Sequence, residues 1–188
     1  MTPYLSFLLS PFVELLRGSD EQEEEDPCGP AQLCVVQTLT KSMTVDEGGP
    51  SVVLTPSDVQ TDTIPPSLSL IAFWRDDRLK QVTPVLVGLV GLAGAEHDAM
   101  HGPHASVGSG REIVSTGLVA LCDTATDDAL LKRLNLDVLM HTRSDEVHVR
   151  IFALQCAQAL WTAHGSKLIG ACGPRGQNTA YLICSHYY

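Results

Sequence analysis

Hydrophobic positions in the second half of the chain recur at the spacing of an amphipathic helix. Between residues 126 and 140, Leu131, Leu134 and Val138 fall three and four apart, on one side of a helix, and Met140 is assigned to the same stripe. Thr126 or Asp127 is expected to begin this helix, because a short acceptor side chain satisfies free amides of the first turn. The polar residues between are expected to face solvent or a neighbouring repeat: Lys132, Arg133, Asn135 and Asp137.

A second helix is predicted after the polar residues 141–145, with Ser144 or Asp145 as its cap. Apolar residues from Val147 to Trp161 fill most of its circumference and leave a narrow polar stripe: His148, Gln155, Gln158 and Thr162. Gly165 is expected to end the helix. Because a helix pair with this much apolar surface cannot cover it alone, the pattern predicts further pairs stacked on both flanks, as in a solenoid.

Four other segments show the same helical period. Residues 4–16 and 32–43 are predicted to pair across an acidic loop, and residues 76–93 and 111–122 to form two more helices. Pro11 is expected to kink or restart the first of them. The predicted core positions, helix by helix, are Leu5, Leu8, Phe12, Leu15 and Leu16; Leu33, Val36, Leu39 and Met43; Leu79, Val82, Leu86 and Val90; and Ile113, Gly117, Leu118 and Leu121.

These segments predict an all-α fold, a HEAT-like α-solenoid segment in four parts. Residues 1–43 form a helix pair with an acidic loop, 44–75 an irregular or disordered insertion, 76–169 the HEAT-like repeats and 170–188 an irregular tail. The insertion is predicted because glycines and prolines punctuate a Ser/Thr-rich stretch without a helical period. Residues 94–110 are predicted to be a loop between two helices.

The candidates for chemistry are few. His97, His101 and His104 have metal-ligand spacing, but the neighbouring glycines and Pro103 disfavour the helix that would bring the first two to one face, so incidental loop histidines are favoured. Ser106 and Ser109 do not complete a GxSxG motif. No catalytic, cofactor-binding or metal-ligating residue is predicted, and the chain is not expected to be an enzyme.

Three further features have a structural and a functional interpretation. Gly88, Gly91 and Gly94 match no phosphate-loop pattern, so close helix packing is favoured. Asp145 and Arg150 are at a spacing that allows an ion-pair ladder between repeats. The favoured alternative is that Asp145 is a helix cap and Arg150 a solvated charge. Trp161 could anchor a partner, but its place on an apolar face favours core packing.

Composition limits which partners the chain is expected to bind and in which cellular compartment it is expected to work. Six of the 22 acidic residues lie between Asp20 and Asp26, so the net charge of −10 mostly reflects one run, interpreted as a solvated loop or a dock for a basic partner. The 12 lysines and arginines are scattered, which argues against direct nucleic-acid binding. No membrane span is predicted. The six cysteines lack CxxC spacing and are expected to be buried reduced thiols in an intracellular compartment: Cys28, Cys34, Cys122, Cys156, Cys172 and Cys184.

The amino-acid sequences of three segments also resemble one protein family, beyond the helical period that they share. They are TPYLSFLLSPFVELL at Thr2–Leu16, RLKQVTPVLVGLV at Arg78–Val90, and Arg111–Leu160, whose most specific part is DDALLKRLNLDVLMHTRSDEVHVR. Together and in this order they resemble the carboxy-terminal region of HEAT repeat-containing protein one, known in fungi as U-three small nucleolar RNA-associated protein ten. The matching segments cover about half of the chain.

The resemblance implies a non-catalytic scaffold of the small-subunit processome in the nucleolus, acting in pre-ribosomal RNA processing, ribosome biogenesis and ribosomal DNA transcription by RNA polymerase I. Its implied partners are other processome proteins, with pre-ribosomal and small nucleolar RNA reached within the complex, and neither a membrane nor a small-molecule substrate. Residues 44–71 and the chain after Gly170 depart from the family pattern, as in a fragment or aberrant isoform. The alternative is a HEAT-type adaptor in nuclear transport or a phosphatase scaffold.

Overall fold

The computed structural model describes residues 2–17, 29–44, 73–95 and 110–172. Within these ranges the chain forms helices and no strand, which confirms the all-α prediction. The α-helices are α1 (Thr2–Arg17), α2 (Pro30–Met43), α4 (Asp76–Ala95), α5 (Gly110–Thr124), α6 (Asp128–Met140) and α7 (Val147–Cys172). A short 3₁₀ turn, His141–Arg143, joins α6 to α7.

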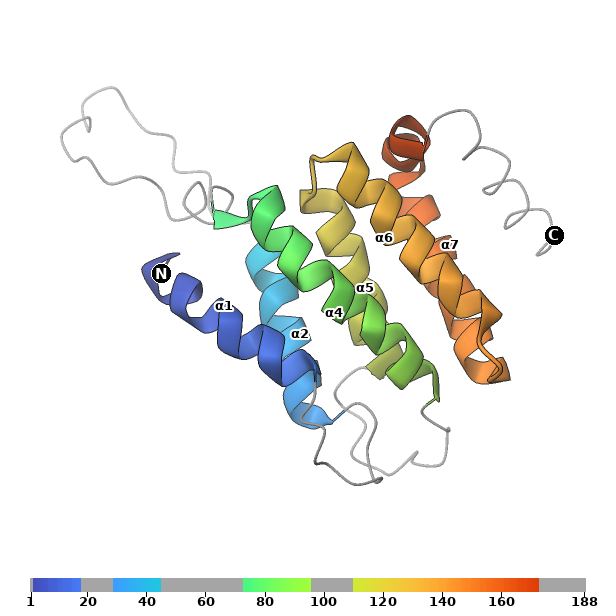
Figure 1. Ribbon diagram of the computed structural model, residues 1–188, viewed down its shortest axis with the longest axis horizontal. Coiled ribbons are helices and arrows are strands. Elements are labelled where there is room, and N and C mark those ends of the chain that lie inside the picture. Colours follow the sequence, from blue (N-terminus) through green and yellow to red (C-terminus); the bar gives the residue numbers. More distant parts are fainter. Residues whose placement is uncertain (1, 18–28, 45–72, 96–109, 173–188) are drawn as a thin grey trace, which may run out of the picture.

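The described helices pack in two layers (Figure 1). One layer contains α1, α4 and α6 in that order, and the other contains α2, α5 and α7. Contacts run between the layers within each pair (α1 with α2, α4 with α5, α6 with α7) and along each layer from one pair to the next. The pair α4–α5 is therefore central, with a neighbouring pair on each side.

The central helix α4 buries the predicted stripe. Leu79, Val82, Leu86 and Val90 are at most 1% exposed, as their spacing of three and four requires. Pro84 lies within the helix on an exposed position, and the hydroxyl of Thr83 donates to the carbonyl oxygen of Leu79 at 2.7 Å, which satisfies a buried polar side chain. On α5, the predicted positions Ile113, Gly117, Leu118 and Leu121 are also buried.

In the first pair, α2 follows the prediction and α1 follows it only in part. Val36, Leu39 and Met43 are buried, with Leu33 partly so. On α1 the buried residues are Leu9, Val13 and Leu16, whereas the predicted Leu8 and Leu15 are 44% and 42% exposed. The prediction was right for Leu16, which is buried, and for Phe12, which is partly buried, but wrong for Leu8 and Leu15, because α1 has apolar residues on several sides and only the side facing α2 and α4 is covered. The side chain of Leu5 lies outside the described residues. Pro11 does not interrupt the helix.

Helix α6 begins as predicted, with the Asp127 carboxylate accepting the amide of Ala129 at 2.9 Å. Leu131, Leu134 and Val138 are buried, but Met140 is 52% exposed. Its assignment to the stripe was wrong, because a residue two positions after Val138 points to the opposite side of the helix.

The helix predicted from Val147 is interrupted one residue before Gly165, close to the predicted end, but helical structure then resumes, so α7 as a whole continues past this glycine. The backbone bends at His164, where φ is −133° and ψ is 27°, and helix then resumes to Cys172, three residues into the predicted irregular tail. After the bend, the ammonium of Lys167 donates to the carbonyl oxygens of Cys122 and Asp123 at 2.7 and 2.6 Å, and Leu168 is fully buried. These contacts hold the last turns against the carboxyl end of α5, where unpaired carbonyls favour a cation.

Two of the three glycines on α4 allow close helix packing. A Cβ at Gly94 would lie 2.8 Å from Val149 Cα, so this glycine allows a close approach of α4 to α7, and a Cβ at Gly91 would lie 3.4 Å from the His141 ring in the 3₁₀ turn. At Gly88 a Cβ would meet nothing within 4 Å, which contradicts the packing prediction there. Gly94 and Ala95 are helical, so the loop predicted from residue 94 starts later than expected.

Residues just before α4 belong to the core, although the predicted insertion included them. Phe73 and Trp74 are 3% and 5% exposed, and their rings meet edge to face at 5.0 Å. Trp74 Nε1 donates to the carbonyl oxygen of Ser42 at 3.1 Å, which ties this segment to the end of α2. The Arg78 guanidinium stacks over the Phe73 ring at 4.1 Å. Most of the predicted insertion, residues 45–72, lies outside the described residues.

Two of the described cysteines match the expectation of buried thiols. Burial raises the pKa of Cys122 to about 11 and that of Cys156 to about 12, which keeps both protonated and unreactive at neutral pH. Cys34 is exposed, which corrects the prediction for that residue, since it lies on the outer side of α2. No described helix has the length and apolar character that crossing a bilayer would require.

Candidate functional site

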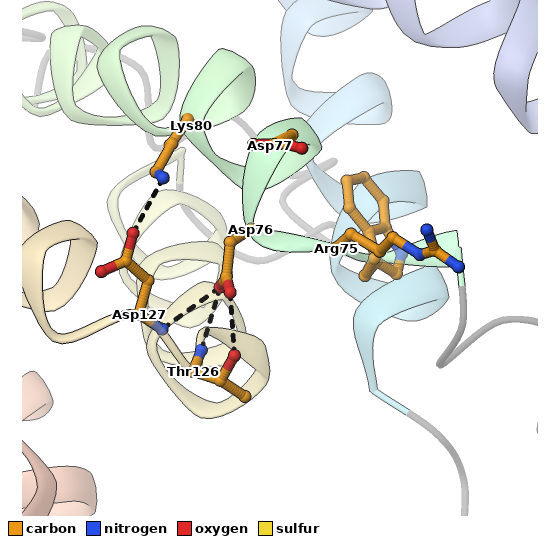
Figure 2. A pocket seen from close by; sticks show the side chains of 7 residues that line it. Arg75, Asp76, Asp77, Lys80, Thr126 and Asp127 are labelled. Atoms are coloured by element: carbon orange, nitrogen blue, oxygen red, sulfur yellow. Dashed lines mark hydrogen bonds and ion pairs between the residues drawn. The ribbon is translucent and has the colours of Figure 1, made fainter.

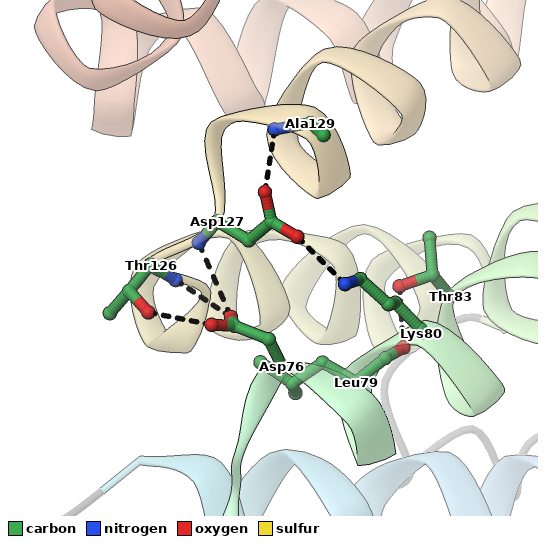
Figure 3. Close-up of polar contacts among 7 residues, drawn as sticks. All are labelled: Asp76, Leu79, Lys80, Thr83, Thr126, Asp127 and Ala129. Atoms are coloured by element: carbon green, nitrogen blue, oxygen red, sulfur yellow. Dashed lines mark hydrogen bonds and ion pairs between the residues drawn. The ribbon is translucent and has the colours of Figure 1, made fainter.

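A polar junction joins the start of α4 to the turn between α5 and α6. The carboxylate of Asp76 accepts hydrogen bonds from the Thr126 amide at 3.1 Å, the Thr126 hydroxyl at 2.9 Å and the Asp127 amide at 3.3 Å (Figure 3). The Thr126 amide contributes most to lowering the pKa of Asp76, because these donors stabilise the charged form. Asp76 thus replaces water as the acceptor for backbone amides fifty residues away.

The second carboxylate of this junction has two partners of its own. Asp127 accepts the Ala129 amide as the cap of α6, and its other oxygen pairs with Lys80 Nζ at 2.8 Å (Figure 3). The Lys80 ammonium is the main cause of the lowered pKa of Asp127. The two contacts connect α4 to α6, so adjacent helix pairs are linked by charge as well as by apolar packing.

An open hollow of about 490 Å³ lies over this junction, lined by Trp74, Arg75, Asp76, Asp77, Lys80, Thr126 and Asp127. Figure 2 shows the Asp76 carboxylate pointing toward Thr126 and the Asp127 amide, and Lys80 pointing toward the Asp127 carboxylate, whereas Arg75 extends away from them. Their polar atoms are already used in the contacts that hold the helices together. For Asp76, Asp127 and Lys80 the arrangement is that of a structural linkage between helix pairs.

Sequence reasoning identified only part of this junction. Asp127 was predicted as a cap, and Thr126 as the other choice. Asp76 and Lys80 were missed as partners, although an acidic pair at the start of an apolar helix is a visible signal for a helix amino terminus. Nothing in the local sequence indicates that Asp76 reaches a turn fifty residues later.

The last helix pair exposes a run of apolar side chains, which we call the end flank. It consists of Leu136 and Met140 on α6, each 52% exposed, and Val147 and Ile151 on α7, at 53% and 44%. Each pair is four residues apart, so each lies on one face of its helix, and the 3₁₀ turn brings the end of α6 close to the start of α7. Exposed apolar side chains gathered in this way are typical of an interaction surface.

Polar contacts hold the two helices of this pair together. Trp161 is half-buried, and its Nε1 donates to Asn135 Oδ1 at 3.0 Å, which supports the core-packing interpretation of Trp161. Asn135 is only 7% exposed and contacts α7 of its own pair, so its assignment to solvent or a neighbouring repeat was wrong. The reason is that a residue one position after Leu134 still faces α7, where the indole offers a donor.

The turn before α7 is closed by backbone acceptors. Arg150 Nη1 donates to the carbonyl oxygens of Ser144 and Asp145 at 2.9 and 2.8 Å, in place of the ion pair with the Asp145 side chain that a ladder would need. The hydroxyl of Ser144 accepts the amide of Glu146 at 3.3 Å, just before α7 begins. Arg150 is therefore a positioning residue within one helix pair.

The remaining sequence candidates fall in parts of the chain that the structure does not describe. His97, His101, His104, Ser106, Ser109 and the acidic run of residues 20–26 lie outside the described residues. Across the described ranges, no group of three or more His, Cys, Asp or Glu side chains is placed to hold a metal ion.

No protein-family model matches the chain. No solved structure matches it closely enough to indicate a shared fold. The function is therefore inferred from the arrangement of the helices, the exposed end flank and the amino-acid sequences of the helices.

Proposed function

We propose that this chain is a non-catalytic scaffold made of stacked HEAT-like helix pairs, working in the nucleolar small-subunit processome. In this role it takes part in pre-ribosomal RNA processing, ribosome biogenesis and ribosomal DNA transcription by RNA polymerase I. The observation that carries the proposal is the order of the described helices: three pairs side by side in two layers, with a central pair between two others.

The positions of the family-like segments support the proposal. Residues 2–16 lie within α1, residues 78–90 within α4, and residues 111–160 span α5, α6 and most of α7. The most specific stretch, residues 127–150, begins at the cap of α6 and includes the turn that Arg150 closes. The resemblance therefore falls on residues that build and join helix pairs, which is what a scaffold of this class depends on.

The basic residues favour protein partners over direct RNA contact. Four of the 12 lysines and arginines donate to backbone carbonyls of their own chain: Arg78, Arg111, Arg150 and Lys167. Phosphate binding needs clustered cations that are available to the ligand, so RNA would be reached through the assembly. The proposed partners are accordingly other processome proteins, with pre-ribosomal and small nucleolar RNA held in the same particle.

Affinity capture from nuclear extract tests this function. The tagged chain is expected to retain processome proteins and pre-ribosomal RNA, and ribonuclease treatment should remove the RNA while leaving the proteins that bind directly. Gly94→Val, which would force α4 away from α7, serves as the fold-disrupted control, and Gly88→Ala as the folded one. Capture of nuclear-transport receptors or phosphatase subunits in place of processome proteins would favour the adaptor alternative and contradict the proposal.

A further inference from the structure

A bend at His164 separates the last turns of α7, residues 165–172, from the rest of the helix. We call these residues the closing segment. Lys167 holds the segment to the carboxyl end of α5 by donating to the carbonyl oxygens of Cys122 and Asp123 at 2.7 and 2.6 Å, and Leu168 is fully buried. The segment is therefore a short piece of helix that is attached to the core by few contacts and is joined to α7 at one non-helical residue.

The imidazole of His164 lies between this segment and α5 with one nitrogen unsatisfied. Its Nε2 is buried from solvent and has no hydrogen-bond partner among the described residues. Its Nδ1 lies 3.9 Å from Asp123 Oδ1, which is too far for a hydrogen bond, and the side chain as a whole is 17% exposed. Folded proteins pair nearly all of their buried polar atoms, so an unpaired ring nitrogen at a bend requires a physical account.

We propose that His164 makes the closing segment a pH-sensitive latch, closed on α5 while the imidazole is neutral and released when the ring gains a proton. A neutral ring buries one bare nitrogen, whereas an imidazolium would bury an N–H donor and a positive charge without an acceptor at the same position. The closed form therefore binds a proton less readily than the open form, whose ring meets water. Closure is favoured fully at neutral pH and weakens as the pH falls below about 6.5, where a solvated histidine titrates.

The charged groups nearest to the ring come from α5 and from α7 itself. The ammonium of Lys167 lies three residues along α7, bonded to the same end of α5, and would repel an imidazolium. The carboxylate of Asp123 would attract it, but this side chain is 73% exposed, so water screens the attraction. Burial raises the pKa of Cys122 to about 11, so its thiol offers no negative charge. These groups together leave the burial of Nε2 uncompensated.

The other helices that pack on α7 do not reverse this balance. On α4, Asp76 and Lys80 are engaged with the turn between α5 and α6. On α6, the bond between Asn135 and Trp161 sets the register and brings Lys132, a further cation, level with His164. The remaining charged residues at this end of α4 and α6, together with Lys132 itself, are exposed: Asp77, Asp128 and Arg133. Solvent screens the effect of exposed charges on a buried ring, so the groups on α5 and α7 decide the response.

Hydrogen exchange of backbone amides in the full chain tests the latch. Peptic fragments that cover the closing segment are compared at about pH 7.5 and about pH 5, on either side of the ordinary histidine value. After correction for the intrinsic effect of pH, exchange in the segment should be faster at the lower pH by up to about thirtyfold, the ratio of charged to neutral imidazole in a solvated histidine at that pH. Fragments from α6 should show no such increase.

Matched histidine variants assign the response to one ring. His164→Gln is neutral at both pH values and should abolish the difference in the closing segment. His148→Gln makes the same change at an exposed position near the start of α7 and should leave the difference as it is in the wild type. A pH response that persists in His164→Gln would overturn the proposal, because another group would then be responsible.

Asp123→Asn provides a second test that keeps His164 in place, in case His164→Gln itself loosens the bend. It removes the carboxylate that attracts an imidazolium in the closed form, so opening should begin at a higher pH than in the wild type. Loss of the pH response in Asp123→Asn would contradict the latch. So would a wild-type segment that is better protected at about pH 5 than at about pH 7.5, because an ion pair between His164 and Asp123 would then outweigh the burial of the ring.

Discussion

Helices α4 and α1 are both rich in apolar residues, yet they bury them very differently. On α4 ten residues are buried, because α1, α5, α6 and α7 surround it. On α1 only Leu9, Val13 and Leu16 are buried among the described side chains, and Phe7 is 79% exposed. The difference shows that position in the stack decides burial here: a helix with neighbours on several sides becomes core, and the same kind of helix at the edge becomes a surface.

The largest expected effect comes from making the same truncation in both helices. Leu86→Ala on α4 removes a side chain that is 1% exposed and should lower the free energy of unfolding by about 2–5 kcal/mol through lost burial and the cavity left behind. Leu15→Ala on α1, at 42% exposure, should cost less than about 1 kcal/mol. Urea denaturation measures both. Equal losses would show that α1 is covered as fully as α4.

Two glycines on α4 should respond with opposite signs. Gly94→Ala would place a Cβ 2.8 Å from the Val149 backbone and should destabilise by about 1–3 kcal/mol, because α4 and α7 must move apart. Gly88→Ala meets nothing within 4 Å and should stabilise the helix by about 0.5–1 kcal/mol, since alanine restricts the unfolded chain and favours helix. Thermal unfolding of the two variants separates them, and a stabilising Gly94→Ala would refute the close approach of α4 to α7.

Within the last pair, a smaller effect should come from the bond between Asn135 and Trp161. A double-mutant cycle with Asn135→Ala and Trp161→Phe should give a coupling energy of about 1 kcal/mol, the usual net contribution of a buried neutral hydrogen bond. A coupling near zero would mean that apolar packing alone holds α6 to α7. In that case the edge pair would resemble the central pair more closely than its contacts suggest.

The smallest expected effect is a pH dependence at the polar junction. The pKa of Asp76 is lowered in the folded chain, chiefly by the Thr126 amide, so its stabilising contribution is present above the unfolded pKa of about 4 and is lost as the pH falls through the lower folded value. Because the group is near the surface, the gain should be below about 1 kcal/mol. Asp76→Asn should reduce the loss of unfolding free energy between neutral and acid pH. An unchanged pH dependence would contradict this role.

The periodicity of the sequence predicted the helices well where neighbours surround them. Leu79, Val82, Leu86 and Val90 are buried as expected, and because α4 has neighbours on several sides, residues outside this stripe are buried as well. The cap at Asp127 was also predictable, since the geometry of a helix amino terminus is local. Local chemistry and a clear stripe are therefore sufficient for these features.

Features that depend on distant parts of the chain were missed. The orientation of α1 follows from where α2 and α4 lie, and its apolar residues on several sides allow more than one choice. Asp76 accepts a hydrogen bond from the amide of Thr126. Lys167 donates to a carbonyl at the carboxyl end of α5, and it lies there because α7 bends at His164 and continues past Gly165. The partners of Asp76 and Lys167 lie more than forty residues away, and spacing along a helix carries no information about them.

The central functional claim is most directly tested by sucrose-gradient sedimentation of the tagged chain from nucleolar extract. A processome scaffold should move with the large particles that contain small-subunit pre-ribosomal RNA, and should shift toward lighter fractions when those particles are disrupted by ribonuclease. Gly88→Ala should sediment with the wild type, and Gly94→Val should leave the heavy fractions. A wild-type chain that remains in the light fractions, while known processome proteins sediment with the heavy ones, would contradict the claim.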